Sequence, residues 1–267
     1  MNRLMSWVKR SLLASMGIGL LLTSSVAHAQ TVDDLVQKGR VSIGVLTGVP
    51  PYTGVDSNGK DDGFHVDVAK LIAKYLGVEV DIVPVTNASR IAALQSGNVD
   101  ILVAHMGPTP ERAKSVMFTM PYAGYNMSII GKKDVDMKDT AALAHKRIAV
   151  PRGGVQDVAL TALKLDGLEI VRFDDDATAI QAALSGQVDG VSIGDTVANM
   201  IIKQNPGANL EVKFPLFWQG FSIGVRKDAF DLRQWLNNFV YYTKLSGELD
   251  ASHQKWIGVP LGDLPSF

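Results

Sequence analysis

Two stretches of similar sequence, AALQSGNVD at 92–100 and AALSGQVD at 182–189, decide the fold of this chain. In each, a helical segment meets a glycine, Gly97 or Gly186, and a strand then starts with Val-Asp. Glycine commonly follows the last residue of a helix, so the same helix–stop–strand step occurs twice. A match this short can also be coincidence, but both copies occupy the same place in a β-α-β series. We therefore expect two similar α/β lobes.

Alternating strands and helices surround both stretches. This order is typical of parallel sheets with right-handed crossovers. The first series has predicted strands at 40–45, 78–83 and 99–104 and helices at 66–75 and 89–95; the second has strands at 147–150, 168–173 and 188–193 and helices at 155–165 and 177–184. Gly77 is expected to end the helix 66–75. The tail 231–256 is predicted to be helical and to pack on the first lobe.

Two extended segments with glycines, 120–130 and 217–225, connect the two series. We expect them to form a two-strand hinge, where a few residues absorb a change of angle. The predicted fold class is a two-lobed α/β protein in which each lobe is a mainly parallel sheet with flanking helices. Lobe 1 comprises 30–124 and 221–267, and lobe 2 comprises 125–220. A ligand site is expected in the cleft between the lobes, at the carboxyl ends of strands.

Residues 1–29 have the pattern of a secretory signal peptide. A basic segment ending at Lys9-Arg10 precedes the apolar run 11–22, and Ala27-His28-Ala29 has the A-x-A form of a cleavage site. The run is shorter than the roughly 20 apolar residues that span a bilayer, so an uncleaved anchor is the less favoured alternative. We predict export to the periplasm with cleavage after Ala29.

Composition narrows the function classes. The chain has 267 residues and a net charge of −1, and without residues 1–29 it has 23 basic and 27 acidic residues, a net charge of −4. Such a balance does not indicate a nucleic-acid partner. The chain has no cysteine, which excludes disulfides, thiolate catalysis and an N-terminal lipid anchor on Cys. No histidine pair has metal-binding spacing and no dinucleotide or G-x-S-x-G motif is present, so we expect no metal or cofactor.

The helix start Thr109-Pro110-Glu111-Arg112 has the residues of an anion site. Thr109 is a preferred N-cap and Pro110 a preferred first helical residue. Free N–H groups at such a start attract carboxylate or phosphate, and the planar Arg112 guanidinium can donate two parallel bonds. Gly107 would let the backbone come close to a ligand. An ordinary capped helix with a surface arginine fits these residues equally well.

Several segments, in this order and spacing, resemble the periplasmic amino-acid-binding proteins of ABC importers, which are type II solute-binding proteins of bacterial family 3. The resemblance covers nearly all of 31–267 and implies lobe closure on a ligand, delivery to an ABC permease in the inner membrane, and no catalysis; we also expect a monomer. The segments are Gly44 with Pro50-Pro51-Tyr52, Asn58-Gly59-Lys60, 63–69, 93–100, 109–112, and Phe118 with Pro121-Tyr122.

The resemblance also implies roles for single residues. Arg112 would clamp the ligand α-carboxylate, helped by the backbone of Gly107, where the usual Ser or Thr hydroxyl is missing. Thr109 would be the helix cap. In lobe 2, backbone N–H groups at Gly154 and Val155 would reach the same carboxylate, since Val155 replaces the usual Thr.

The residue that meets the ligand ammonium is ambiguous by one position: Gly194 aligns without a gap, and Asp195, which we favour, aligns with a shift of one residue. An acid and two aromatics usual in the family are replaced by Leu46, Val49 and Asn87. These departures predict a small or differently oriented polar ligand rather than a cationic one. Asn87 is a possible hydrogen-bond partner, and the possible walls, which could equally be core residues, are Tyr52, Tyr125, Phe217 and Trp218.

Two other features are expected to be structural. His105 lies in the proposed ligand loop and could touch a ligand, but a plain structural histidine is favoured. The run Asp174-Asp175-Asp176 lacks EF-hand spacing and is expected to be a solvated helix start.

The sequence therefore predicts a binding protein that captures a small amino acid or related carboxylate. The alternative is an enzyme resembling cyclohexadienyl dehydratases, which share the fold and use a Glu after the lobe-2 strand. Residues 194–200 contain no Glu, and general acid catalysis needs a positioned proton donor.

Overall fold

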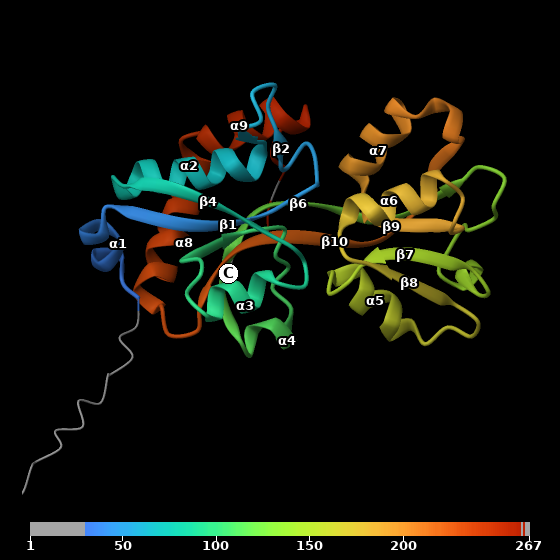
Figure 1. Cartoon of the computed structure of the whole chain (residues 1–267), viewed down its shortest axis with the longest axis horizontal. Coiled ribbons are helices and arrows are strands. Elements are labelled where there is room, and N and C mark those ends of the chain that lie inside the picture. The colour runs from blue at the N-terminus through green and yellow to red at the C-terminus, as the bar shows by residue number, and fades with distance from the viewer. Residues whose placement is uncertain (1–29, 263, 265–267) are drawn as a thin grey trace, which may run out of the picture.

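A computed structural model describes residues 30–262 and 264; the predicted signal peptide and its cleavage site lie outside the described residues. Two groups of helices and strands lie side by side and share one eight-stranded sheet (Figure 1). Its strand order is β4-β1-β5-β10-β6-β9-β7-β8. The strands are β1 Arg40–Leu46, β4 Glu79–Val85, β5 Ile101–Val103, β6 Val116–Lys132, β7 Arg147–Pro151, β8 Glu169–Phe173, β9 Gly190–Gly194 and β10 Leu210–Arg226.

Each half of the sheet has a parallel core. β1 pairs in parallel with β4 and β5 in lobe 1, and β7 pairs in parallel with β8 and β9 in lobe 2. In Figure 1, α2 and α9 cover one face of lobe 1 and α3 lies toward the other, while α6 and α7 lie opposite α5 in lobe 2. The helices are α1 Val32–Lys38, α2 Phe64–Leu76, α3 Arg90–Gln95, α4 Pro110–Ala113, η1 Ala141–Leu143, α5 Val155–Leu163, α6 Asp176–Leu184, α7 Asp195–Gln204, η2 Pro206–Ala208, α8 Phe230–Leu245 and α9 Glu248–Ile257.

The predicted fold class is confirmed, and the predicted strands and helices of both series begin and end within about two residues of the observed ones. Gly77, with φ +70°, follows α2 as its C-cap, as expected. The short hairpin of β2 (Gly54–Val55) and β3 (Asp61–Asp62) was not predicted. Among the helices of the described residues, none combines the length and apolar character needed to cross a membrane.

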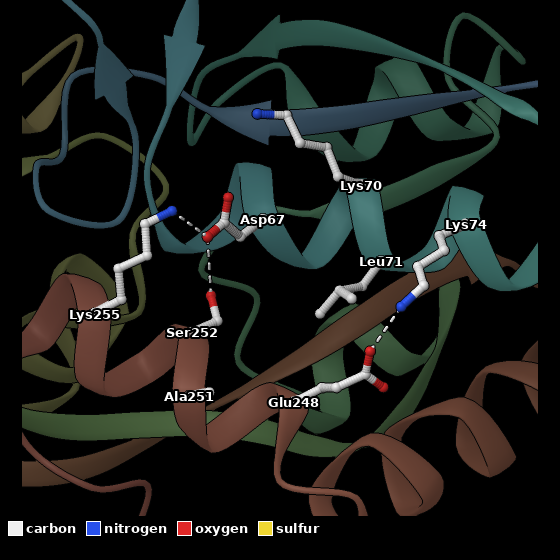
Figure 2. A pocket seen from close by; sticks show the side chains of 8 residues that line it. All are labelled: Asp67, Lys70, Leu71, Lys74, Glu248, Ala251, Ser252 and Lys255. Carbon is white, nitrogen blue, oxygen red and sulfur yellow. Dashed lines mark hydrogen bonds and ion pairs between the residues drawn. The ribbon is translucent and has the colours of Figure 1, made fainter.

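The predicted single tail helix is wrong, because the tail forms two helices. Gly247, with φ +79°, separates α8 from α9, and only glycine adopts this conformation readily. The tail does return to lobe 1, where α9 packs against α2 (Figure 2). Ser252 Oγ and Lys255 Nζ both donate to Asp67 Oδ2 of α2, at 3.3 and 3.0 Å.

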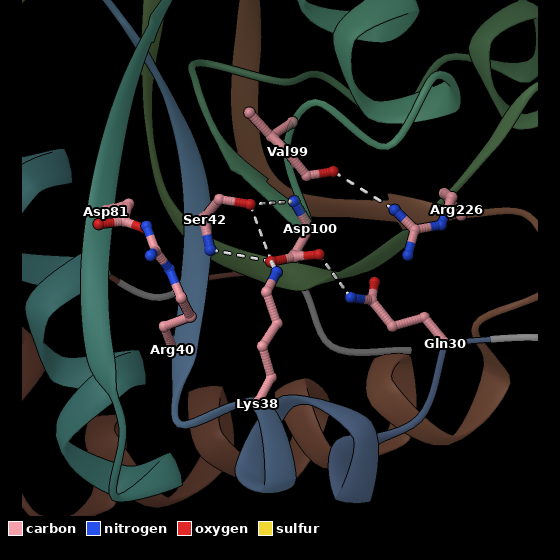
Figure 3. A network of polar contacts seen from close by, with 8 residues as sticks. All are labelled: Gln30, Lys38, Arg40, Ser42, Asp81, Val99, Asp100 and Arg226. Atoms are coloured by element: carbon pink, nitrogen blue, oxygen red, sulfur yellow. Dashed lines mark hydrogen bonds and ion pairs between the residues drawn. The ribbon is translucent and has the colours of Figure 1, made fainter.

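The repeated Val-Asp sequence has the same structural role in both lobes. In lobe 1, the Asp100 N–H donates to Ser42 O at 2.8 Å. In return, the Asp100 carboxylate accepts from the Ser42 N–H at 2.9 Å, a bond drawn in Figure 3. In lobe 2, Asp189 makes the same reciprocal pair with Arg147, at 2.9 and 2.7 Å. Asp100 therefore attaches the start of β5 to β1, and Asp189 attaches the start of β9 to β7. The sequence echo is a structural repeat.

The hinge consists of β6 and β10, two antiparallel strands of 17 residues each that run from one lobe into the other. Gly124 and Gly220 are register partners at the middle of this pair. The Trp218 indole lies against both glycines: a β-carbon on Gly124 would come 2.5 Å from Trp218 Cζ2, and one on Gly220 would come 3.0 Å from Cη2. The predicted boundaries between the lobes, at 124/125 and 220/221, coincide with these two glycines. This division of the chain into lobes stays a prediction.

Candidate functional site

A small cavity lies between the two lobes, where the carboxyl ends of the parallel strands meet. The last residue of β1 and residues that follow β4, β5, β7 and β8 all reach it, as expected for a ligand site in an α/β sheet. Its free volume is about 10 Å³, about enough for one water molecule, so the lobes are closed on each other. Its lining residues are Leu46, Asn87, Arg90 and His105 from lobe 1, Met127, Val155, Gln156 and Asp176 from lobe 2, and Tyr125 and Gln219 from the crossing strands.

Arg112 connects the two lobes beside this cavity. Thr109 caps α4 by accepting a hydrogen bond from the Arg112 N–H at 3.3 Å, and Pro110 is the first helical residue. The guanidinium donates from Nη1 to Gly107 O at 3.1 Å and from Nη2 to Gly153 O of lobe 2 at 3.0 Å. Burial lowers the pKa of Arg112 to about 10, so it remains a cation at neutral pH. Because α4 is a single turn, the guanidinium carries more of the charge at this point than the helix dipole.

Gly107 is close to Gln219 of β10. A β-carbon at 107 would lie 2.9 Å from Gln219 Cδ, so the glutamine occupies the space that a larger residue at 107 would need. The Gln219 amide is buried and donates to Gly220 O at 2.5 Å. Gln219 therefore presents a polar side chain to the cleft from the hinge, at a position that the sequence did not indicate.

Tyr125 occupies the space beside Gly194, just as Gln219 occupies the space beside Gly107. Gly194 caps α7, and a β-carbon there would lie 2.5 Å from Tyr125 Cζ, so a side chain at 194 would collide with the ring. Asp195 begins α7 and accepts from the Thr196 N–H at 2.8 Å and from Asn126 Nδ2 at 3.3 Å. The cavity wall is formed here by Tyr125, and the Asp195 carboxylate is directed toward Asn126 at the edge of the cleft.

The lobe-2 loop reaches the cavity through Val155 and Gln156. The Gly154 N–H, a predicted carboxylate donor, already donates to Pro151 O at 3.1 Å, and the Gly153 N–H donates to Asp157 Oδ2 at 3.2 Å. A ligand carboxylate would therefore compete with these partners, or use the N–H groups at the start of α5.

Arg90 is a cleft residue that the sequence analysis missed. It is the first residue of α3 and only 1% exposed, and its Nη1 donates to Ala104 O at 2.7 Å. Burial, reinforced by the positive charge of Arg112, lowers the pKa of Arg90 to about 9. The available signal was a charged residue one helical turn before the buried Leu94, on the apolar face of a short helix.

Asp176 faces Arg90 from the other lobe. Asp175 caps α6 by accepting from the Thr178 N–H at 2.8 Å, which confirms the predicted helix start. The expectation that the whole run is solvated is wrong for Asp176, which is 8% exposed and accepts from Asn87 Nδ2 at 2.9 Å. Burial raises the pKa of Asp176 to about 6, although Arg90 and Asn87 act in the opposite direction. Asn87 is thus an interlobe hydrogen-bond partner.

An aromatic cluster lies directly below the cavity. His105, with φ +50°, packs its ring 4.6 Å from that of Tyr52 and 4.5 Å from that of Phe221. Burial, with His65 and Arg90 nearby, lowers the pKa of His105 well below its usual value, so the imidazole is neutral. Tyr52 is fully buried, and the start of α7 lies close to its hydroxyl: burial raises the Tyr52 pKa, while Thr196 and Asp195 act on it in opposite directions. His105 lines the cavity and Tyr52 supports it from beneath.

A larger hollow, of about 420 Å³, lies on the surface of lobe 1 between α2 and α9 (Figure 2). Its acidic side chains are already paired, Glu248 with Lys74 at 2.8 Å and Asp67 with Lys255 at 3.0 Å. Both of its walls belong to one lobe, so a ligand there would make no contact that depends on lobe closure. The interlobe cleft is the better candidate despite its smaller volume.

Comparison with known proteins agrees with this geometry. The sequence profile of the bacterial extracellular solute-binding proteins, family 3, matches residues 41–259. The chain is 26% identical over 256 residues to the L-cystine-binding protein TcyJ of Escherichia coli strain K12, which covers 94% of this chain and 96% of that protein.

Two solved structures are similar over most of the chain. The solute receptor for L-cysteine of Neisseria gonorrhoeae has a TM-score of 0.79 and 31% identity, covering 85% of this chain and 93% of that one. An ancestral amino-acid-binding protein, described as a precursor of cyclohexadienyl dehydratase, has a TM-score of 0.78 and 32% identity, covering 85% of this chain and 100% of that one.

Proposed function

This chain belongs to the bacterial extracellular solute-binding proteins of family 3, and on that basis we propose that it captures a small amino acid or related carboxylate for an ABC importer. The ligand enters the open cleft, the lobes close on it, and the closed protein delivers it to a permease in the inner membrane. Closure follows ligand binding because a ligand that contacts both lobes has a higher affinity for the closed state.

The observation that carries the proposal is the position of Arg112. Its guanidinium lies between the lobes and donates to one carbonyl oxygen on each side, at Gly107 and Gly153. A ligand carboxylate can replace these neutral acceptors with a charged one, and charge-assisted bonds to a planar guanidinium are about twice as strong. Thr109 supports the clamp by fixing the start of α4.

The other predicted site residues complete the proposed site. Asn87 and Val155 line the cavity, and we propose that the ligand carboxylate reaches the backbone of Gly107, beside which Gln219 fills the space in the closed protein. Tyr52 supports the floor. We propose that Gly154 contributes backbone contacts in the ligand-bound state, and that Asp195, which accepts from Asn126 in the closed protein, meets the ligand ammonium.

Isothermal titration calorimetry with the standard amino acids tests this function. The protein should first be unfolded and refolded to remove any co-purified ligand. Removing one partner of a buried charge pair costs about 2–5 kcal/mol, so Arg112→Ala should weaken binding by roughly 30-fold or more. Lys114→Ala is the matched control, because Lys114 follows the same helix but is exposed and pairs with Glu111. Unchanged affinity in Arg112→Ala would contradict the assigned clamp.

We also propose that residues 1–29 direct export and are removed after Ala29, so that the periplasmic protein begins at Gln30. We further propose that it acts as a monomer. N-terminal sequencing and the mass in solution check these two points.

A second candidate function is a dehydratase on the same fold. Asp176 favours it, since a buried carboxyl with a pKa near 6 in a cleft is suited to donate a proton. Against it, α7 from Asp195 to Met200 contains no Glu, and the proteins named above are binding proteins. Measurable loss of prephenate or arogenate on incubation with the protein would reverse the ranking.

A further inference from the structure

One buried residue beside the cavity has a backbone conformation that side chains of its type rarely allow. In the part of the chain that the structure describes, four residues other than glycine have a positive φ: His105, His145, Lys164 and Asn209. The last three are exposed on the surface. His105, with φ +50°, is only 7% exposed. Such conformations persist where the surrounding structure holds them, and they are concentrated at ligand sites.

The His105 imidazole also has unused hydrogen-bonding capacity. Two residues that line the cavity have a buried side-chain atom without a hydrogen-bond partner among the described residues, namely Nε of Arg90 and Nε2 of His105. Tyr52 and Phe221 pack against the imidazole, with ring centroids 4.6 and 4.5 Å away, and fix its position. Because an unpaired buried polar atom is costly, a ligand group that pairs with this ring would gain affinity.

The charges of the cleft are balanced without a contribution from a ligand side chain. Arg90 of lobe 1 has the carboxylate of Asp176 of lobe 2 as its anionic neighbour, and each charge acts on the pKa of the other group. Under the proposed function, Arg112 and Asp195 bind the two charged groups that every amino acid carries. A further charge on the ligand side chain would therefore be buried without a partner, which is unfavourable.

A neutral imidazole is suited to bind a neutral polar group. Burial, with His65 and Arg90 nearby, lowers the pKa of His105 well below its usual value, so the ring has one N–H donor and one acceptor nitrogen. Hydroxyl and carboxamide groups also donate and accept hydrogen bonds, and a thiol does so more weakly. An aliphatic side chain can do neither and would leave the buried nitrogen unpaired.

We propose that His105 determines the specificity of the site by hydrogen-bonding the ligand side chain, and that the ligand is a neutral amino acid with a hydroxyl, carboxamide or thiol group. This inference rests on the proposed binding function and adds to it a substrate class and the residue that selects it. The aromatic rings beneath His105 hold the imidazole against the cavity, so a ligand without a polar group cannot be accommodated by turning the ring away.

Calorimetry with the refolded protein tests the inference on pairs of ligands of nearly equal shape. The pairs are serine or cysteine with 2-aminobutyrate, threonine with valine, asparagine with leucine, and glutamine with norleucine. The amino acid that binds most tightly should have a neutral polar side chain and should bind roughly 10-fold or more tightly than its apolar partner, because the apolar partner leaves a buried nitrogen unpaired.

Two variants separate the imidazole from a general effect on folding. His105→Phe keeps an aromatic ring but removes both nitrogens, so it should bring the polar-to-apolar ratio close to one. His253→Phe is the matched control and should keep the wild-type ratio. His253 is also a buried histidine of lobe 1 that packs on an aromatic ring, that of Phe64 at 5.3 Å, but it does not line the cavity.

Each outcome decides one of two questions. Tightest binding of a charged or purely apolar amino acid, or of cystine, would overturn this inference and leave the proposed function intact, as would an unchanged ratio in a folded His105→Phe. If His105→Phe does not fold, His105→Gly replaces it, because glycine adopts a positive φ freely, and an unchanged ratio there would overturn the inference equally. No heat with any amino acid would instead overturn the proposed function, and this inference with it.

Discussion

Removing the carboxylate of Asp100 tests whether the repeated aspartates stabilise the two lobes. It is 5% exposed and accepts hydrogen bonds from Ser42 N at 2.9 Å, Ser42 Oγ at 2.8 Å and Gln30 Nε2 at 2.6 Å. Lys38 also reaches it, at 3.1 Å, but its side chain is 47% exposed and should add little. Asp100→Ala removes all of these bonds and leaves the Ser42 N–H without its carboxylate partner.

The expected loss follows from the two Ser42 bonds. A hydrogen bond to a charged acceptor contributes about 1.5–3 kcal/mol, so two such bonds sum to about 3–6 kcal/mol; because both Ser42 donors share Asp100 Oδ2, Asp100→Ala should lower the free energy of unfolding by an amount near the lower end, about 3–4 kcal/mol. For a protein of this size that corresponds to a decrease in Tm of about 10 °C. Asp189→Ala is the control, because Asp189 accepts the equivalent backbone bond from Arg147 without a serine hydroxyl, and it should lose about half as much.

Thermal and urea unfolding, followed by circular dichroism at neutral pH, measure both variants. The pH dependence gives a second readout. Burial alone would raise the pKa of Asp100, but the bonds from Ser42, Gln30 and Lys38 outweigh it and hold the pKa below its usual value. The stabilisation is therefore complete above the unfolded-state pKa of about 3.9 and is lost as the pH falls through the lower folded-state pKa. A Tm decrease in Asp100→Ala no larger than that of Asp189→Ala would refute the reasoning.

Two further predictions concern the cleft. Gly194→Ala places a β-carbon 2.5 Å from Tyr125 Cζ and should cost about 1–3 kcal/mol in urea unfolding. The same substitution made in a Tyr125→Ala background should cost little relative to Tyr125→Ala alone, and an equal cost in both backgrounds would show that the collision is not the cause. The folded-state pKa of Asp176 is raised to about 6, so the wild-type protein should lose stability as the pH rises from about 4 to 6. Asp176→Asn should remove this pH dependence of the free energy of unfolding. An equal pH dependence in the variant would assign it to another group.

The fold could be predicted because its signals are local. The helix at 64–76 has an apolar face and a glycine stop at Gly77, and the Val-Asp starts of two strands repeat with the same neighbours. The tail was predicted as one helix because Gly247 lies within an otherwise helical pattern, and a single glycine is often tolerated there.

The site could be predicted only in part. Asn87 and Val155, which were named from their places in the family pattern, do line the cavity, and the helix start that suggested Arg112 forms as expected; the roles of all three toward a ligand stay predictions. Tyr125 was named as a possible wall, but Gln219 was missed, because it becomes the neighbour of Tyr125 only through the register of β6 and β10, which is shifted by several irregularities that no local pattern reveals. Asp176 was misjudged because a solvated and a buried helix start have the same sequence signature, and the opposite lobe decides which one forms.

The indole at the centre of the hinge gives the molecule an optical readout of its own. Trp218 rests on Gly124 and Gly220, and about 44% of its surface is exposed, so a change in the angle between the strands changes its solvent contact. The other two tryptophans after residue 29 lie in the C-terminal helices. Trp235 stacks on Phe239, and Trp256 donates a hydrogen bond to Asp67. A shift in intrinsic fluorescence on adding a ligand would therefore follow the hinge itself, and stopped-flow mixing could time the movement without any attached dye.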